Sequence, residues 1–87
     1  ATYSISDAYP NPFNPVTSIT LEILQAGQVS VQVYNIVGQV VATLASGHMD
    51  INTYSLTWDA SNVSSGVYFV KAEIAGTITT QKVMLMK

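Results

Sequence analysis

The chain has few residues equipped for catalysis or metal binding. His48 is its only histidine, and it has no cysteine. Multi-histidine and thiolate metal sites therefore cannot be assembled, and a lone imidazole lacks the partner groups that acid–base catalysis usually recruits. His48 and Asp50 flank Met49 in a segment that looks turn-like, so we interpret this pair as exposed loop residues.

Oxygen-bearing side chains form a second group with chemical potential. Asp59, Asn62 and Ser64 carry oxygens of the kind that Ca²⁺ binds, but they fall short of a full coordination shell, and Asx turns explain them as well. Serine is common, yet no Gly-x-Ser-x-Gly motif is present to support a hydrolase nucleophile. We therefore expect no catalytic residues, no cofactor and no metal site in this chain.

The aromatic residues permit two interpretations. On an exposed sheet face they would form a platform for sugar rings, whereas in a small domain they would fill the core. Trp58 shares its alternation phase with Leu56 and Tyr54, which favours a core position for the indole ring. Phe69 lies opposite Tyr68 in phase, beside Lys71 and Glu73, so we expect Phe69 to be the exposed aromatic of this group.

Composition limits the size of the fold and its partners. The chain has 87 residues, 48% of them apolar and 9% charged, with a net charge of −2, which predicts one small folded domain spanning residues 1–87. Its three cations are all lysines, too few to neutralise several phosphates, so nucleic acid is not an expected partner. The longest apolar runs have four residues, far below the ~20 needed for a transmembrane helix.

Apolar and polar residues alternate with a period of two along most of the chain, which is typical of strands with one buried face. In residues 17–24, for example, Ile19, Leu21 and Ile23 alternate with polar residues. We expect strands at residues 3–6, 17–24, 29–33, 39–45, 54–58, 67–74 and 78–86. Their number and spacing predict an all-β fold, a seven-stranded immunoglobulin-like antiparallel β-sandwich, with a small barrel as the alternative.

Three prolines fall within residues 9–15, Tyr-Pro-Asn-Pro-Phe-Asn-Pro. Each proline removes a backbone donor and disfavours helix in the residue before it, so we expect a rigid and extended segment. This proline-rich segment has no glycine, serine or charged residue, which argues against a flexible linker. We expect Tyr9 and Phe13 to pin it to the edge of the sandwich.

Five short motifs occur in a fixed order along the chain. They are residues 9–15 (YPNPFNP), 33–39 (VYNIVGQ), 58–60 (WDA), 65–69 (SGVYF) and 82–87 (KVMLMK). In this order they resemble the C-terminal sorting domain of proteins exported by the type IX secretion system of outer-membrane bacteria. The structural residues that carry the resemblance are Tyr9, Pro10, Asn11, Pro12, Phe13, Gly38, Trp58, Gly66 and Tyr68. Where the family usually has Ala-Gly before the Trp-Asp strand, this chain has Ile51-Asn52, so that turn is expected to differ.

The resemblance implies a non-catalytic tail of a larger protein. Such a domain directs an upstream cargo domain of the same precursor across the outer membrane, after a transient passage through the periplasm, to the cell surface or the medium. Its implied partners are the outer-membrane type IX translocon and a sortase-like peptidase. The alternative is a carbohydrate-binding, spacer or cell-attachment domain of a secreted glycoside hydrolase.

Residues 82–87 are the expected terminal recognition strand, with Lys82, Val83, Leu85 and Lys87 as its recognition residues. The two lysines lie five residues apart, so perfect alternation would point them to opposite faces. One interpretation is that they protect an exposed sheet edge against aggregation. The other is that this end of the chain docks on the secretion machinery, with its edge adding to a partner sheet.

Overall fold

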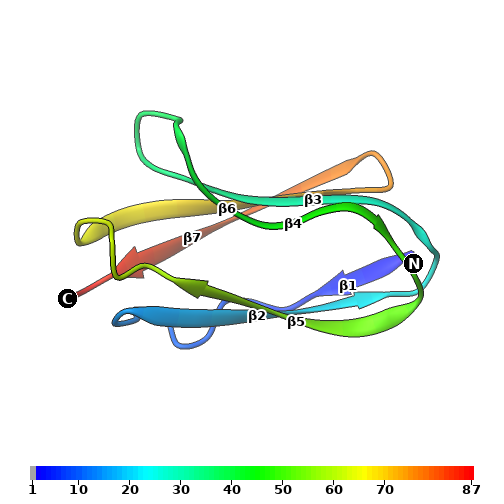
Figure 1. The fold of residues 1–87 in the computed structure, drawn as a ribbon, viewed down its shortest axis with the longest axis horizontal. Helices are drawn as coiled ribbons and strands as arrows, with labels where there is room; N and C mark the ends of the chain where they lie inside the picture. The colour runs from blue at the N-terminus through cyan, green and yellow to red at the C-terminus, as the bar shows by residue number, and fades with distance from the viewer. Residues whose placement is uncertain (1) are drawn as a thin grey trace.

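The computed structural model describes residues 2–87, which form two antiparallel sheets packed face to face (Figure 1). The smaller sheet has the order β1-β2-β5 and consists of β1 (Tyr3–Ile5), β2 (Val16–Ile23) and β5 (Asn52–Asp59). The larger sheet has the order β4-β3-β6-β7 and consists of β3 (Gly27–Tyr34), β4 (Val40–Met49), β6 (Gly66–Ile74) and β7 (Thr77–Leu85). The predicted seven-stranded all-β sandwich is confirmed.

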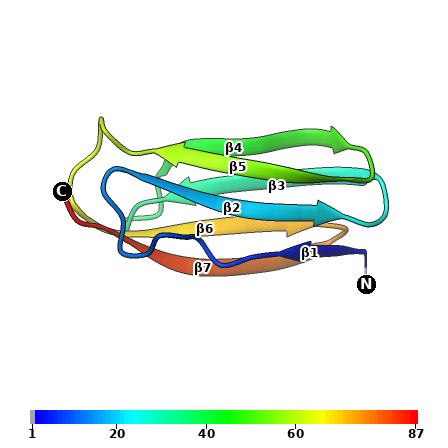
Figure 2. The same cartoon turned by 90° about the horizontal axis from the view of Figure 1, so that it is seen from below.

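The chain crosses between the two sheets three times, from β2 to β3, from β4 to β5 and from β5 to β6 (Figure 2). The fourth strand pairs with the third, whereas in a constant-type immunoglobulin domain it joins the first sheet. The two strands joined by each of these connections therefore lie in different sheets, on opposite sides of the core. This arrangement leaves β1, β5, β4 and β7 as the edge strands.

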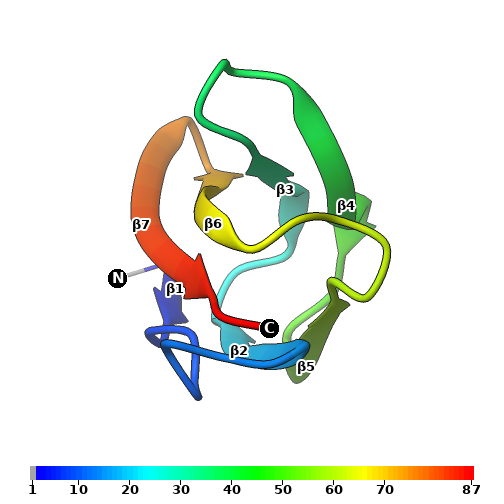
Figure 3. The same ribbon diagram turned by 90° about the vertical axis from the view of Figure 1, so that its left-hand side faces the viewer.

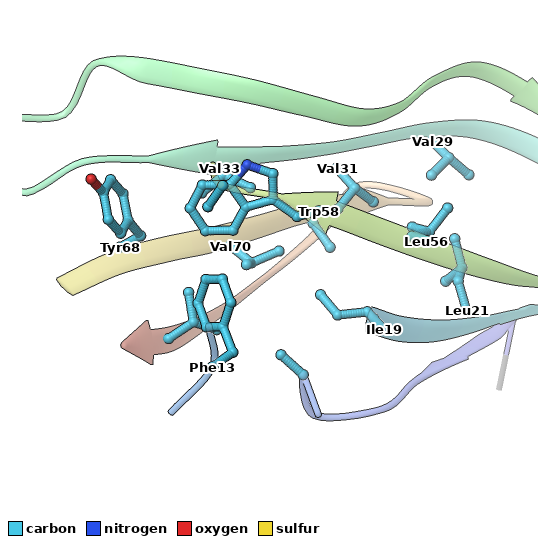
Figure 4. Close-up of a cluster of buried hydrophobic side chains, with 14 of the residues drawn as sticks. Phe13, Ile19, Leu21, Val29, Val31, Val33, Leu56, Trp58, Tyr68 and Val70 are labelled. Carbon is cyan, nitrogen blue, oxygen red and sulfur yellow. The ribbon is translucent and has the colours of Figure 1, made fainter. Parts of the chain in front are cut away.

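The strands form where the sequence alternates, because each buries one row of side chains between the sheets. In β2, the side chains of Ile19, Leu21 and Ile23 are buried, and the intervening polar residues face outward. On the other side of the core, the larger sheet contributes Val29, Val31 and Val33 of β3 and Val70 of β6 (Figure 4). Hydrophobic burial along these rows is the main source of stability in a fold that has no disulfide.

At one end of the sandwich, three aromatic rings from distant parts of the sequence pack together (Figure 4). The ring centroid of Trp58 lies 5.4 Å from that of Phe13 and 5.2 Å from that of Tyr68, the latter in an edge-to-face arrangement. All three residues are buried, so the expected core position of Trp58 is confirmed. The hydroxyl of Tyr68 donates to the carbonyl of Ser64 at 2.6 Å, a tyrosine corner that anchors the loop before β6.

β4 runs to Met49, well beyond the expected end at residue 45. Residues Ala45 to Met49 pair with the first half of β3, and their burial alternates: Ala45 and Met49 pack against the core, whereas Ser46 and His48 are exposed. Small residues replace large apolar ones on the inner side, which hides the strand in the sequence. The β3–β4 pairing also has two irregularities in register, so the buried positions along β4 do not follow a single alternating phase. His48 is consequently a strand residue, and the expectation that it lies in a turn-like segment was wrong, although its side chain is exposed as expected.

A hairpin loop at residues 35–39 joins β3 to β4. The side-chain oxygen of Asn35 accepts hydrogen bonds from the backbone N–H groups of Val37 (3.1 Å) and Gln39 (3.0 Å). Gly38 has a φ of 85°, a conformation that a residue with a Cβ rarely adopts. These contacts give the loop a defined shape although its tip is exposed.

We predict that Trp58→Ala destabilises the domain by about 3–5 kcal/mol, because it leaves a cavity between Phe13 and Tyr68. Urea unfolding followed by circular dichroism measures the change. The matched control is Ile51→Ala, which removes an exposed side chain and should change the free energy of unfolding by less than about 0.5 kcal/mol. Equal effects of the two substitutions would contradict the core assignment.

Candidate recognition site

The C-terminal strand β7 is the last strand of the larger sheet, and it pairs with β6 along one side only. The side chains of Val83 and Leu85 point into the core and are 0% and 1% exposed. Those of Lys82 and Met84 point away from the core and are exposed. Of the four expected recognition residues, Lys82 and Lys87 thus lie at the surface of the folded domain, and Val83 and Leu85 do not.

The outer edge of β7 is covered by the proline-rich segment, which contacts it with backbone and side chain together. The carboxamide of Asn11 accepts from the N–H of Met84 (3.0 Å) and donates to the carbonyl of Lys82 (3.0 Å). Phe13 then donates its N–H to the carbonyl of Met84 (3.0 Å) and accepts from the N–H of Met86 (2.9 Å), a parallel bridge to the strand. The backbone edge from Lys82 to Met86 is therefore occupied.

Further along, side chains of β7 contact β1 and the segment that follows it. The carboxamide of Gln81 accepts from the N–H of Ala8 (2.7 Å) and donates to the carbonyl of Ser6 (3.1 Å). The hydroxyls of Thr79 and Tyr3 lie 3.0 Å apart. These contacts join β7 to the N-terminal part of the chain, which lies beside it in the end-on view (Figure 3).

The structure corrects two expectations about this edge. The side chain of Phe13 is buried and fixes the proline-rich segment to the core, whereas the side chain of Tyr9 is 81% exposed and takes no part in fixing it. Tyr9 instead bonds Ser18 through its backbone in both directions, at 2.9 and 3.1 Å. The edge of residues 82–86 is also not free to add to a partner sheet, since Asn11 and Phe13 already pair with it.

The last residue is held by the loop between β5 and β6. The ammonium of Lys87 donates to the carbonyl of Ser61 (2.8 Å), and its backbone N–H donates to the hydroxyl of Ser65 (3.0 Å). Within this loop the hydroxyl and the backbone N–H of Ser61 both donate to the carboxylate of Asp59. These two hydrogen bonds, with a smaller attraction from Lys87, hold the pKa of Asp59 below its ordinary value.

Of the residues with catalytic or metal-binding potential, His48 and Asp50 lie apart from this end of the fold, and Asn62 and Ser64 are exposed in the loop before β6. His48 and Asp50 lie 3.1 Å apart and are both well exposed. Asp59 and Ser61 form an Asx turn, and the carbonyl of Ser64 accepts from Tyr68. Within residues 2–87, no group of three or more histidines and acidic residues is arranged to hold a metal ion, and no helix is long and apolar enough to cross a membrane.

Phe69 is half-buried, so it is less exposed than expected, and Tyr9 is far more exposed. The reason lies in its neighbours on the outer face of the larger sheet. Phe69 pairs with Tyr34 on one side and with Lys82 on the other. The ammonium of Lys71 lies 5.7 Å from the centroid of the Tyr34 ring, within the range of a cation–π interaction.

Comparison with known proteins identifies a family for nearly the whole chain. A family model described as a secretion system C-terminal sorting domain matches residues 7–86. The matched range contains both the proline-rich segment and the β7 edge that it covers. A search of curated proteins found no match.

We predict that Asn11→Ala lowers the free energy of unfolding by about 1–2 kcal/mol, because both hydrogen bonds of its carboxamide to β7 are lost. The amide hydrogen of Met84 should also exchange faster with solvent. Asn14→Ala is the matched control, since the Asn14 side chain makes no hydrogen bond within the described residues 2–87 and is exposed. Stability and Met84 exchange that match the control would show that Asn11 does not hold the edge.

Proposed function

The chain belongs to the family of secretion system C-terminal sorting domains, and on this basis we propose that it directs a cargo protein through the type IX secretion system. The cargo is an upstream domain of the same precursor. It passes through the periplasm, crosses the outer membrane and reaches the cell surface or the medium. The proposed partners of the domain are the outer-membrane translocon and a sortase-like peptidase that removes it.

The observation that carries this proposal is the family match over residues 7–86. The structure adds a physical reason for two of the motifs. Residues 9–15 and 82–87 lie at opposite ends of the sequence, and they contact each other through Asn11 and Phe13. Two of the motifs by which the chain resembles the family therefore form one unit, in which the proline-rich segment covers the edge of the terminal strand.

We further propose that Lys82 and Lys87 contact the secretion machinery. Both residues are exposed, and Lys87 is the last residue of the chain, at the end of the sandwich marked C in Figure 1. Val83 and Leu85 contribute indirectly, because their burial in the core fixes the strand that presents Lys82. The role of an aromatic sugar platform is disfavoured, since Trp58 is buried and Lys71 lies over the ring of Tyr34.

We predict that a reporter fused to the N-terminus of this chain is exported to the surface or medium when it is produced in the periplasm of a host with a type IX system. Cell fractionation and activity of the reporter measure its distribution. The same reporter fused to residues 1–81, which lack the terminal segment, should stay in the periplasm. Equal distribution of the two fusions would argue against a sorting role.

We predict that Lys82→Glu combined with Lys87→Glu abolishes export of the fused reporter. Because both side chains are exposed, the free energy of unfolding should change by less than about 1 kcal/mol in total. The charge-preserving variant Lys82→Arg, Lys87→Arg serves as the control and should be exported. Wild-type export of a stably folded glutamate variant would exclude these lysines from the recognition surface.

A further inference from the structure

The outer face of the larger sheet carries a continuous group of apolar and basic side chains at the end where the chain terminates. Tyr34, Phe69 and Lys82 are neighbours across β3, β6 and β7. Val40 pairs with Tyr34, and Met84 follows Lys82 on the same face. We call Tyr34, Val40, Phe69, Lys71, Lys82 and Met84 the outer-face patch.

The apolar part of this patch is not explained by the needs of the core. Val40 and Met84 are exposed, and the hairpin loop beyond Tyr34 rises above this face of the sheet (Figures 1 and 3). At the tip of that loop, Ile36 and Val37 are 75% and 72% exposed. Groups of exposed apolar side chains on a small domain commonly mark a binding surface.

The outer face of the smaller sheet provides an internal comparison. Its outward positions on β2 and β5 are occupied mainly by serine and threonine, for example Thr20 and Thr57, with Glu22 as a charged member. A polar outer face is thus compatible with this sandwich. The apolar character of the outer-face patch is therefore a property of that surface rather than of the fold.

The charge of the patch is opposite to that of the chain. The net charge is −2, yet two of the three lysines, Lys71 and Lys82, lie on the patch. The ion pair found within residues 2–87, between His48 and Asp50, involves neither lysine. Glu73 is on the same face further along β6, and its carboxylate forms no ion pair with Lys71 in the described part of the chain. Two ammonium groups beside apolar side chains complement a surface with carboxylates beside apolar side chains.

A protein surface fits this patch better than a glycan does. Sugar rings stack on the open face of an aromatic ring, but the ammonium of Lys71 lies over the ring of Tyr34, and Phe69 is half-buried between its neighbours. The remaining contact area is aliphatic, from Val40, Met84 and the loop tip. Aliphatic and aromatic side chains ringed by charges are typical of the contact surfaces between proteins.

We propose that the outer-face patch docks on an acidic, partly apolar surface of a protein of the secretion machinery. This inference rests on the proposed sorting function and specifies the surface through which it acts. The patch extends the contact from the terminal lysines to Lys71 of β6 and Val40 of β4, which lie outside the terminal segment.

The test uses export of the fused reporter with two single variants, Lys71→Glu and Val40→Glu. Placing a carboxylate against an acidic partner is strongly unfavourable, so each variant should lower the exported fraction about tenfold or more. The matched control is the pair Thr20→Glu, Thr57→Glu on the outer face of the smaller sheet, which changes the net charge by the same −2 as Lys71→Glu. This control should be exported like the wild type, and urea unfolding of each purified chain verifies its fold.

The outcomes separate the inference from the function on which it rests. Export of folded Lys71→Glu and Val40→Glu at the control level, with normal export of the wild type, overturns the docking surface and leaves the sorting function standing. Failure of the wild-type fusion to be exported overturns both. Retention of the purified wild-type chain on immobilised polygalacturonate, lost in Lys71→Glu while export is normal, would replace the protein partner with an anionic glycan.

Discussion

The fold depends on how the open backbone edge of its C-terminal strand is satisfied. β7 pairs with β6 on one side, and its other side would present unpaired N–H and C=O groups, a common route to aggregation. Asn11 and Phe13 cover this edge with four hydrogen bonds, two from a side chain and two from the backbone. The prolines that alternate with these residues have no N–H to leave unpaired.

The same segment also completes the core. Phe13 contacts the ring of Trp58, which in turn contacts Tyr68, so the residue that bonds the strand edge also closes one end of the aromatic cluster. Tyr68 holds the loop before β6, and this loop holds Lys87 through Ser61 and Ser65. The position of the last residue is therefore linked to the proline-rich segment through a chain of packed and hydrogen-bonded groups.

Much of this architecture could be predicted from the sequence, because alternation directly reports which face of a strand is buried. Trp58 was assigned to the core from its phase with Leu56, and the structure agrees. Alternation failed where small residues replace large ones, as in the second half of β4, which ends at Met49. It also says nothing about segments outside strands, so the opposite orientations of Tyr9 and Phe13 were not foreseen. The bonds of Asn11 to β7 were missed because a side-chain contact across more than 70 residues leaves no local pattern.

The contact between Asn11 and β7 joins residues separated by 71 and 73 positions in the sequence. The loop that it closes includes nearly the whole domain, and such long-range contacts form late because the chain entropy of closing the loop opposes them. During synthesis, β7 is translated after Asn11 and after the other six strands. The completed edge therefore exists only on a chain that has been translated through β7, and a prematurely terminated chain would expose the proline-rich segment without its partner. In this fold, the assembled edge of β7 is in effect a physical record that all seven strands have been translated.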